Sequence, residues 1–131
     1  MTPAGVSPSR IKQIAVPVDS VDEAKIFYAE ALGLRHLFDA PPALAFFDCG
    51  GIQLMLAGPP AQGDDGGRQH PVLYYEVEDI KAAHARIKSS GAKVIEEPRI
   101  IARMNGREIW ISAVSDGQGN VVQFMSEVAE S

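Results

Sequence analysis

The sequence predicts an α+β protein made of two tandem strand–helix–three-strand units. Two sets of matching positions support this prediction. A strand that runs into a capped helix occurs twice, with Val18 matching Val77. A later hairpin also occurs twice, with Asp48 matching Asp116. The hairpin positions lie further apart than the strand positions, which means that the second unit carries extra residues, and we place these around 99–107.

The first unit begins with a strand over 11–18, in which Ile14, Val16 and Val18 alternate with less apolar residues. This period of two is typical of a half-buried strand. A helix over 21–32 follows, with Ser20 and Glu23 as a capping box and Gly33 as its end. Three further strands are expected over 34–38, 43–49 and 52–57.

The second unit repeats this order. A strand over 72–77 leads to a helix over 80–90, capped by Asp79 and ended by Gly91. A short strand over 93–96 and strands over 108–114 and 121–125 complete the unit. His84 lies on the apolar stripe of the second helix, so we expect it to pack in the core.

The domain organisation follows from these elements. We expect a flexible arm over 1–9, a first module over 10–57, a linker over 58–71, a second module over 72–127 and a tail over 128–131. Each half is too short to bury a good core alone, so the modules should form one structural domain.

Composition excludes several classes of function. The formal net charge is −5, and no basic stripe is present that could neutralise phosphates, so we expect no nucleic-acid or membrane partner. The single Cys49 allows no intrachain disulfide and gives no metal-finger spacing. The sequence shows no N-terminal apolar segment of a signal peptide and no long apolar run, which predicts a cytoplasmic protein.

Three motifs together point to a known family. They are Ile14-x-Val16-x-Val18, the run Ala24-x-x-Phe27-Tyr28-x-x-x-Leu32-Gly33-Leu34, and the turn Asp116-Gly117-Gln118-Gly119-Asn120. The pattern resembles the vicinal oxygen chelate superfamily, which includes glyoxalase I, methylmalonyl-CoA epimerase, extradiol dioxygenases and the bleomycin and fosfomycin resistance proteins. The resemblance covers residues 11–126 and implies two βαβββ modules forming an open, partly closed barrel around a central cavity. One fold hosts many chemistries, so the motifs specify the reaction poorly.

Strand parity maps the cavity independently of the resemblance. If the helices cover the apolar face that includes Ile14 and Tyr75, the opposite face must line the cavity. That face is of mixed polarity, as ligand-binding walls are. It consists of Gln13, Ala15, Pro17, Gln53, Met55, Val72, Tyr74, Glu76, Val121, Gln123 and Met125.

The extra segment of the second module adds further candidates. Arg99, Arg103 and Arg107 lie in it, and we expect the segment to form a mobile flap whose arginines suit an anionic ligand. Trp110 either packs in the core or stacks on a planar ligand together with Tyr74. The predicted ligand-binding residues are therefore Gln13, Gln53, Met55, Val72, Tyr74, Glu76, Arg103, Trp110 and Gln123.

The resemblance also implies four metal-ligand positions, which fall here on Gln13, Met55, Val72 and Gln123. Valine offers no lone pair, and a thioether is a poor ligand for hard divalent ions. Two neutral amides carry no charge to offset the desolvation of a dication. We therefore expect no metal and no other cofactor.

Our leading hypothesis is a protein that binds a small molecule in this cavity, similar in kind to the bleomycin-resistance branch. The alternative is an enzyme: a metal-dependent lyase or isomerase with rearranged ligands, or a metal-free one that uses Glu76 or Tyr74. Glu76 is the best candidate base because it is the one carboxylate in the inward set, although it also fits a rim ion pair. A third hypothesis is a subunit with a vestigial cavity. A homodimer is expected, because the curved sheet leaves edges that need covering.

Overall fold

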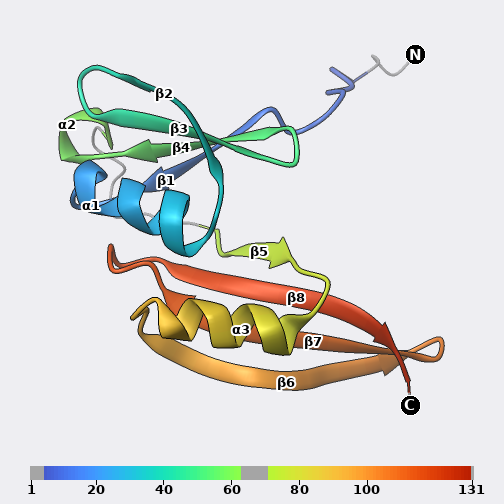
Figure 1. The fold of residues 1–131 in the computed structure, drawn as a ribbon. Helices are drawn as coiled ribbons and strands as arrows, with labels where there is room; N and C mark the ends of the chain where they lie inside the picture. Colours follow the sequence, from blue (N-terminus) through green and yellow to red (C-terminus); the bar gives the residue numbers. More distant parts are fainter. Residues whose placement is uncertain (1–4, 63–70, 131) are drawn as a thin grey trace.

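The computed structural model describes residues 5–62 and 71–130, and they form two four-stranded mixed sheets (Figure 1). The first sheet has the strand order β1-β4-β3-β2 and the second the order β5-β8-β7-β6. The sheets do not close into a barrel, which confirms the open arrangement of two βαβββ modules. Strands β1 and β5 lie at the edges where the two sheets face each other.

The first module contains β1 (Gln13–Pro17), α1 (Val21–Ile26), the π-helix η1 (Phe27–Ala31), β2 (Arg35–Ala40), β3 (Leu44–Cys49) and β4 (Ile52–Ala57). A short helix, α2 (Pro59–Gln62), follows within the predicted linker, whose residues 63–70 lie outside the described residues. The second module contains β5 (Leu73–Glu76), α3 (Ile80–Ser89), β6 (Val94–Met104), β7 (Arg107–Ser115) and β8 (Val121–Ala129). Strand β8 continues past the predicted module boundary at 127.

The strand register reproduces the repeat that the sequence predicts. In the first module, β1 pairs with β4 in parallel and Ala15 lies opposite Met55. In the second, β5 pairs with β8 in parallel and Tyr74 lies opposite Gln123. Tyr74 is the repeat of Ala15 and Gln123 is the repeat of Met55, so the duplication extends to the pairing of individual residues.

Helix α1 differs from its prediction at both ends. The Ser20 side chain accepts from the Glu23 backbone N–H at 3.2 Å, but the Ser20 backbone N–H donates to Gln118 Oε1 instead of Glu23. The capping box is thus completed by a residue of the other module. The helix ends in the π-helix η1, where the Leu32 N–H donates to the Phe27 carbonyl.

The extra residues of the second module do not form a flap. They lengthen one strand, β6, which replaces the predicted short strand over 93–96 and pairs with β7 along the ladder from Val94 to Met104. The chain turns at Asn105 and Gly106, both with positive φ. Because this segment is paired in a sheet, the expectation of a mobile flap is wrong.

Two apolar clusters form the core, and the modules share them. The first surrounds Tyr28 and Phe47 under α1, and the second lies between α3 and the second sheet, where it includes Val114 and Phe124. Phe27 packs against both clusters. His84 is buried in the second module, as predicted.

Polar contacts also cross from one module to the other. The Tyr28 hydroxyl donates to Asp116 Oδ2 at 2.8 Å, and the Asn120 side-chain amide donates to the Pro17 carbonyl at 2.7 Å. Gln118 Oε1 accepts from the backbone N–H groups of Asp19 and Ser20. Among the described residues, no helix has the length and apolar character needed to cross a membrane.

Candidate functional site

Each sheet has one face that packs against helices and an opposite face, which we call the open face. In β1, Ile14 and Val16 pack with the first apolar cluster, so the alternate residues Gln13 and Ala15 lie on the open face. In the second module, Tyr75 packs with the second cluster, which places Tyr74 and Glu76 on the open face. Strand parity therefore sorts these residues as the sequence predicts.

Three predicted residues of the first module are in direct contact. Gln53 Nε2 donates to Gln13 Oε1 at 2.6 Å, and Gln13 Nε2 lies 3.6 Å from Met55 Sδ. The register of β1 and β4 explains the contact, because Gln13 lies opposite Gln53 and Met55 is the next residue along the same face. Two amides and a thioether thus form one polar group on this face.

An aromatic pair extends the first open face and was missed from the sequence. The Phe38 ring stacks on the Phe46 ring, with centroids 4.4 Å apart and an interplanar angle of 22°. Phe46 lies opposite Met55 in the β3–β4 ladder and is 7% exposed, whereas Phe38 is 49% exposed. The alternation of side chains along β3 would have placed Phe46 on the open face if the register of β3 with β4 had been known.

The second open face is less polar. Tyr74 is 54% exposed and lies opposite Gln123, and Val72, just before β5, is 47% exposed. Glu76 lies opposite Met125 and is exposed. Gln123 Oε1 is buried and accepts no hydrogen bond from the described residues.

Trp110 and Arg103 do not join this set. Trp110 packs against the cluster under α3, and Lys81 Nζ lies 4.9 Å from its ring centroid. The Arg103 guanidinium makes ion pairs with Glu108 at 3.5 Å and Glu130 at 3.7 Å, beside the tip of the β6–β7 hairpin. Both were predicted as cavity residues. The register of β7 turns Trp110 to the helix side, away from Tyr74, and the ion pairs of Arg103 hold it at the hairpin.

The four positions that the resemblance assigns to metal do not fit a divalent ion. Met55 offers a thioether, which already contacts Gln13, and Val72 offers no donor atom. Within residues 5–62 and 71–130, no three His, Cys, Asp or Glu side chains gather as a metal-binding group. The donors on the open face suit hydrogen bonding to an organic molecule better than coordination.

Comparison with known proteins decides the family. The family model for the Glyoxalase/Bleomycin resistance protein/Dioxygenase superfamily matches residues 10–127. The chain belongs to this superfamily.

Several solved structures share the fold of this superfamily member. The chain is similar to a lactoylglutathione lyase from Agrobacterium tumefaciens, with 25% identity over 91% of this chain and 94% of that one and a TM-score of 0.69. It is similar to TnmS3, an antibiotic binding protein from Streptomyces sp. CB03234, with 23% identity over 95% and 100% of the two chains and a TM-score of 0.72. A glyoxalase/bleomycin resistance protein/dioxygenase from Alicyclobacillus acidocaldarius is 18% identical over 93% and 94%, with a TM-score of 0.69. No curated protein matches the chain.

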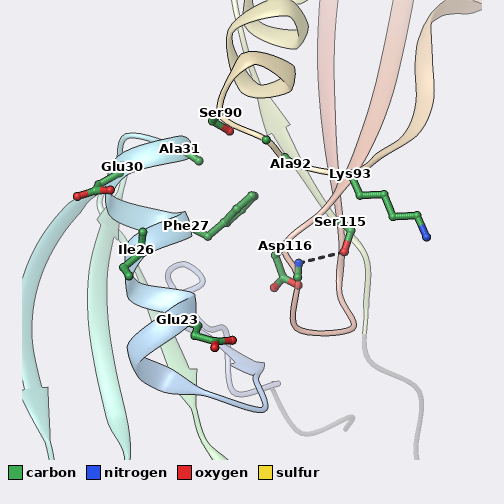
Figure 2. Close-up of a pocket in the computed structure, with 12 residues that line it drawn as sticks. Glu23, Ile26, Phe27, Glu30, Ala31, Ser90, Ala92, Lys93, Ser115 and Asp116 are labelled. Carbon is green, nitrogen blue, oxygen red and sulfur yellow. Dashed lines mark hydrogen bonds between the residues drawn. The ribbon is translucent and has the colours of Figure 1, made fainter.

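This superfamily member also has a hollow of about 470 Å³ where its two modules meet on the helix side (Figure 2). Figure 2 shows Phe27 projecting from the first helix toward Ala92, with Ser115 and Asp116 on the opposite turn. The Asp116 carboxylate accepts from Tyr28, and burial together with this negative charge raises the pKa of that phenol. The carboxylate thus holds the modules together, and the lining of the hollow includes none of the predicted site residues.

Proposed function

We propose that this superfamily member binds a small organic molecule on its open faces and does so without the family's metal centre. The observation that carries the proposal is the group formed by Gln13, Gln53 and Met55. Gln13 and Met55 occupy two of the positions where the resemblance implies metal ligands, and they offer an amide and a thioether there. Neutral amides both donate and accept hydrogen bonds, so they recognise polar atoms of a neutral ligand at little electrostatic cost.

The aromatic side chains of the open faces favour a ligand with a planar part. One face of the Phe38 ring is covered by Phe46, and the side chain is half exposed, so a further ring can stack on it. Tyr74 offers a second exposed ring on the other module. Because the described helices leave the open faces uncovered, we also propose that the protein is a homodimer in which a second copy encloses the ligand. Sedimentation that detects only the monomer at micromolar concentration would contradict the dimer.

Metal content tests the first half of the proposal. We expect purified native protein to contain no stoichiometric transition metal by elemental analysis and to give no zinc-binding heat by calorimetry. The triple variant Met55→Glu, Val72→His, Gln123→Glu restores charged and imidazole ligands, so it should bind zinc measurably. Met55→Leu is the control, because it alters the same position without supplying a ligand. One metal per native chain, released by Met55→Leu, would overturn the proposal and support a metal-dependent lyase or isomerase.

Ligand screening tests the second half. A thermal-shift screen of planar heteroaromatic compounds, with and without divalent ions, should yield compounds that stabilise the protein in both conditions. Phe38→Ala and Tyr74→Ala should each weaken such a compound about two- to tenfold, as expected for the loss of one ring contact. Ile95→Ala, a half-exposed apolar residue of β6, is the matched control and should change nothing. Compounds that stabilise only with added metal would favour the enzyme instead.

A further inference from the structure

A hollow of about 300 Å³ lies between the two modules, where β5 faces the first sheet. Most of its wall is apolar and comes from both modules. The residues that define this seam hollow are Ile14, Leu34, Ile52, Leu73, Tyr75 and Phe124. A smaller hollow of about 250 Å³ shares Ile14, Leu73 and Tyr75 with it, so the apolar space continues along the seam.

The topology explains why this space is not filled. β1 and β5 are each the outermost strand of a sheet, and among the described strands no ladder of hydrogen bonds joins the two sheets. Side chains of β1 and β5 therefore pack against each other without the close spacing that hydrogen-bonded neighbouring strands impose. Protein interiors are normally packed with few voids larger than a water molecule, so an apolar space of this size is a place for a ligand.

The polar groups of the hollow define the chemistry of that ligand. Burial is the main cause that raises the pKa of the Tyr75 phenol, and nearby Cys49 and Asp116 add to it, so Tyr75 stays neutral and can donate a hydrogen bond. Burial likewise raises the pKa of the Cys49 thiol, which stays protonated and poorly nucleophilic. Glu76 is the one carboxylate among the described residues of the wall, and it is exposed.

We propose that the seam hollow is a second binding site, separate from the open-face group of Gln13, Gln53 and Met55, for a neutral and mainly apolar small molecule. Tyr74 and Glu76 border both the hollow and the open face of the second module. The ligand carries one hydrogen-bond acceptor, which the Tyr75 hydroxyl engages, and is held without a covalent bond. A hollow of this size is at the small end of ligand pockets, which suits a small, single-ring molecule. Because its walls come from both modules, an occupant stabilises their junction.

Acetophenone is a suitable probe, since it is neutral, carries one carbonyl acceptor and has an aromatic ring for the apolar wall. Cys49 is the one cysteine of the chain and lines the hollow, so its rate of alkylation by N-ethylmaleimide reports occupancy. We expect acetophenone to slow alkylation in a saturable way. Ethylbenzene, which lacks the carbonyl, should protect Cys49 at about two- to tenfold lower affinity, the ratio expected for one hydrogen bond.

Variants localise the effect. Tyr75→Phe should abolish the preference for acetophenone over ethylbenzene, and Ile52→Phe should fill the hollow and remove protection by both. Ile95→Phe makes the same change at a half-exposed site that does not line the hollow, and should leave protection intact. Phe38→Ala, which weakens binding at the open face and alters no residue of the hollow, should also leave the preference intact.

Three results would overturn the proposal. One is the absence of saturable protection up to the solubility limit of the probe. Another is a preference for acetophenone that Tyr75→Phe leaves unchanged, together with protection that Ile52→Phe does not reduce. The third is loss of protection in Phe38→Ala, which would assign the probe to the open face and contradict a separate site. These outcomes are independent of whether any compound from the planar screen binds the open faces.

Discussion

The two modules have the same strand register but opposite character on their open faces. In the first, Gln13, Gln53 and Met55 form a hydrogen-bonded polar group. The matching positions of the second, in the same repeat, are Val72, Val121 and Gln123. Both valines are substantially exposed, at 47% and 38%. The repeat thus keeps one backbone while its two faces differ, one suited to hydrogen bonding and the other to apolar contact.

The modules also differ in how their helices are tied to the outermost strand. In the first, Asp39 of β2 pairs with Lys25 of α1 at 2.6 Å and with His36 at 2.7 Å, all near the surface. In the second, Glu97 of β6 lies 2.9 Å from Nε2 of the buried His84 and 3.6 Å from Lys88 Nζ. The acidic residue of the outermost strand thus contacts exposed side chains in the first module, whereas in the second module one of its contacts is the buried His84 ring.

The largest expected effect tests whether the modules are one folding unit. Phe47 is fully buried in the first cluster, so Phe47→Ala should lower the free energy of unfolding by about 3–5 kcal/mol. Trp110, the one tryptophan, reports on the second module by fluorescence, and circular dichroism reports on the whole chain. Urea transitions from the two signals should coincide and shift together. A fluorescence transition left in place by Phe47→Ala would show that the second module is stable alone.

The next effect tests the polar link between the modules. Tyr28→Phe removes the hydroxyl that donates to buried Asp116 and should cost about 1.5–3 kcal/mol, the range for a hydrogen bond to a charged group. Tyr74→Phe removes a hydroxyl from an exposed ring and should cost almost nothing. Urea unfolding of both variants measures the contrast. Equal losses would mean that the Tyr28–Asp116 bond does not hold the modules together.

Local signals account for the parts of the fold that the sequence predicts correctly. Ser20 and Asp79 cap their helices as expected, because each capping side chain binds a backbone N–H in the first turn of its own helix. The predicted repeat appears as matched strand registers, because alternation with period two survives in β1 and β5. The same alternation correctly places Gln13 and Tyr74 on the open faces of their sheets.

Long-range features were missed for a different reason. The partner of the Ser20 N–H is Gln118, which lies in the other module and has no local signature. The flap was predicted from the extra length of the second unit and the turn residues Asn105 and Gly106, whereas the structure uses that length to extend β6, which pairs with β7 through three register shifts. The side on which Trp110 lies depends on the pairing of β7 with β8, and its aromatic character fits either side. These features depend on which strands pair and in which register, and strand pairing cannot be read from local patterns in one sequence.

A smaller effect compares the two ionic connections. Glu97→Gln removes a carboxylate that lies 3.6 Å from Lys88 Nζ and 2.9 Å from the buried His84 ring, and should cost about 0.5–1 kcal/mol, near the upper end for a partly exposed ion pair. Glu96→Gln on the same strand, where Glu96 pairs with Arg99, is the control, and because both partners reach solvent it should cost less. Thermal unfolding at neutral pH compares the variants. A larger loss for Glu96→Gln would contradict the role given to the buried ring.

The smallest effect concerns Asp39 and depends on pH. The hydrogen bond from Lys25 is the main cause that lowers the pKa of Asp39, and the bond from His36 adds to it. Because the folded pKa lies below the unfolded one, near 3.9, the carboxylate contributes its full stability above about pH 4 and loses it as the pH falls through the lowered folded value. The side chain is half exposed, so Asp39→Asn should cost only a few tenths of a kcal/mol, about 0.2–0.5 kcal/mol, at neutral pH. Urea unfolding measures the difference in free energy of unfolding between the native protein and Asp39→Asn, and this difference should shrink on acidification and in molar salt. A difference that grows toward low pH would contradict the assigned sign.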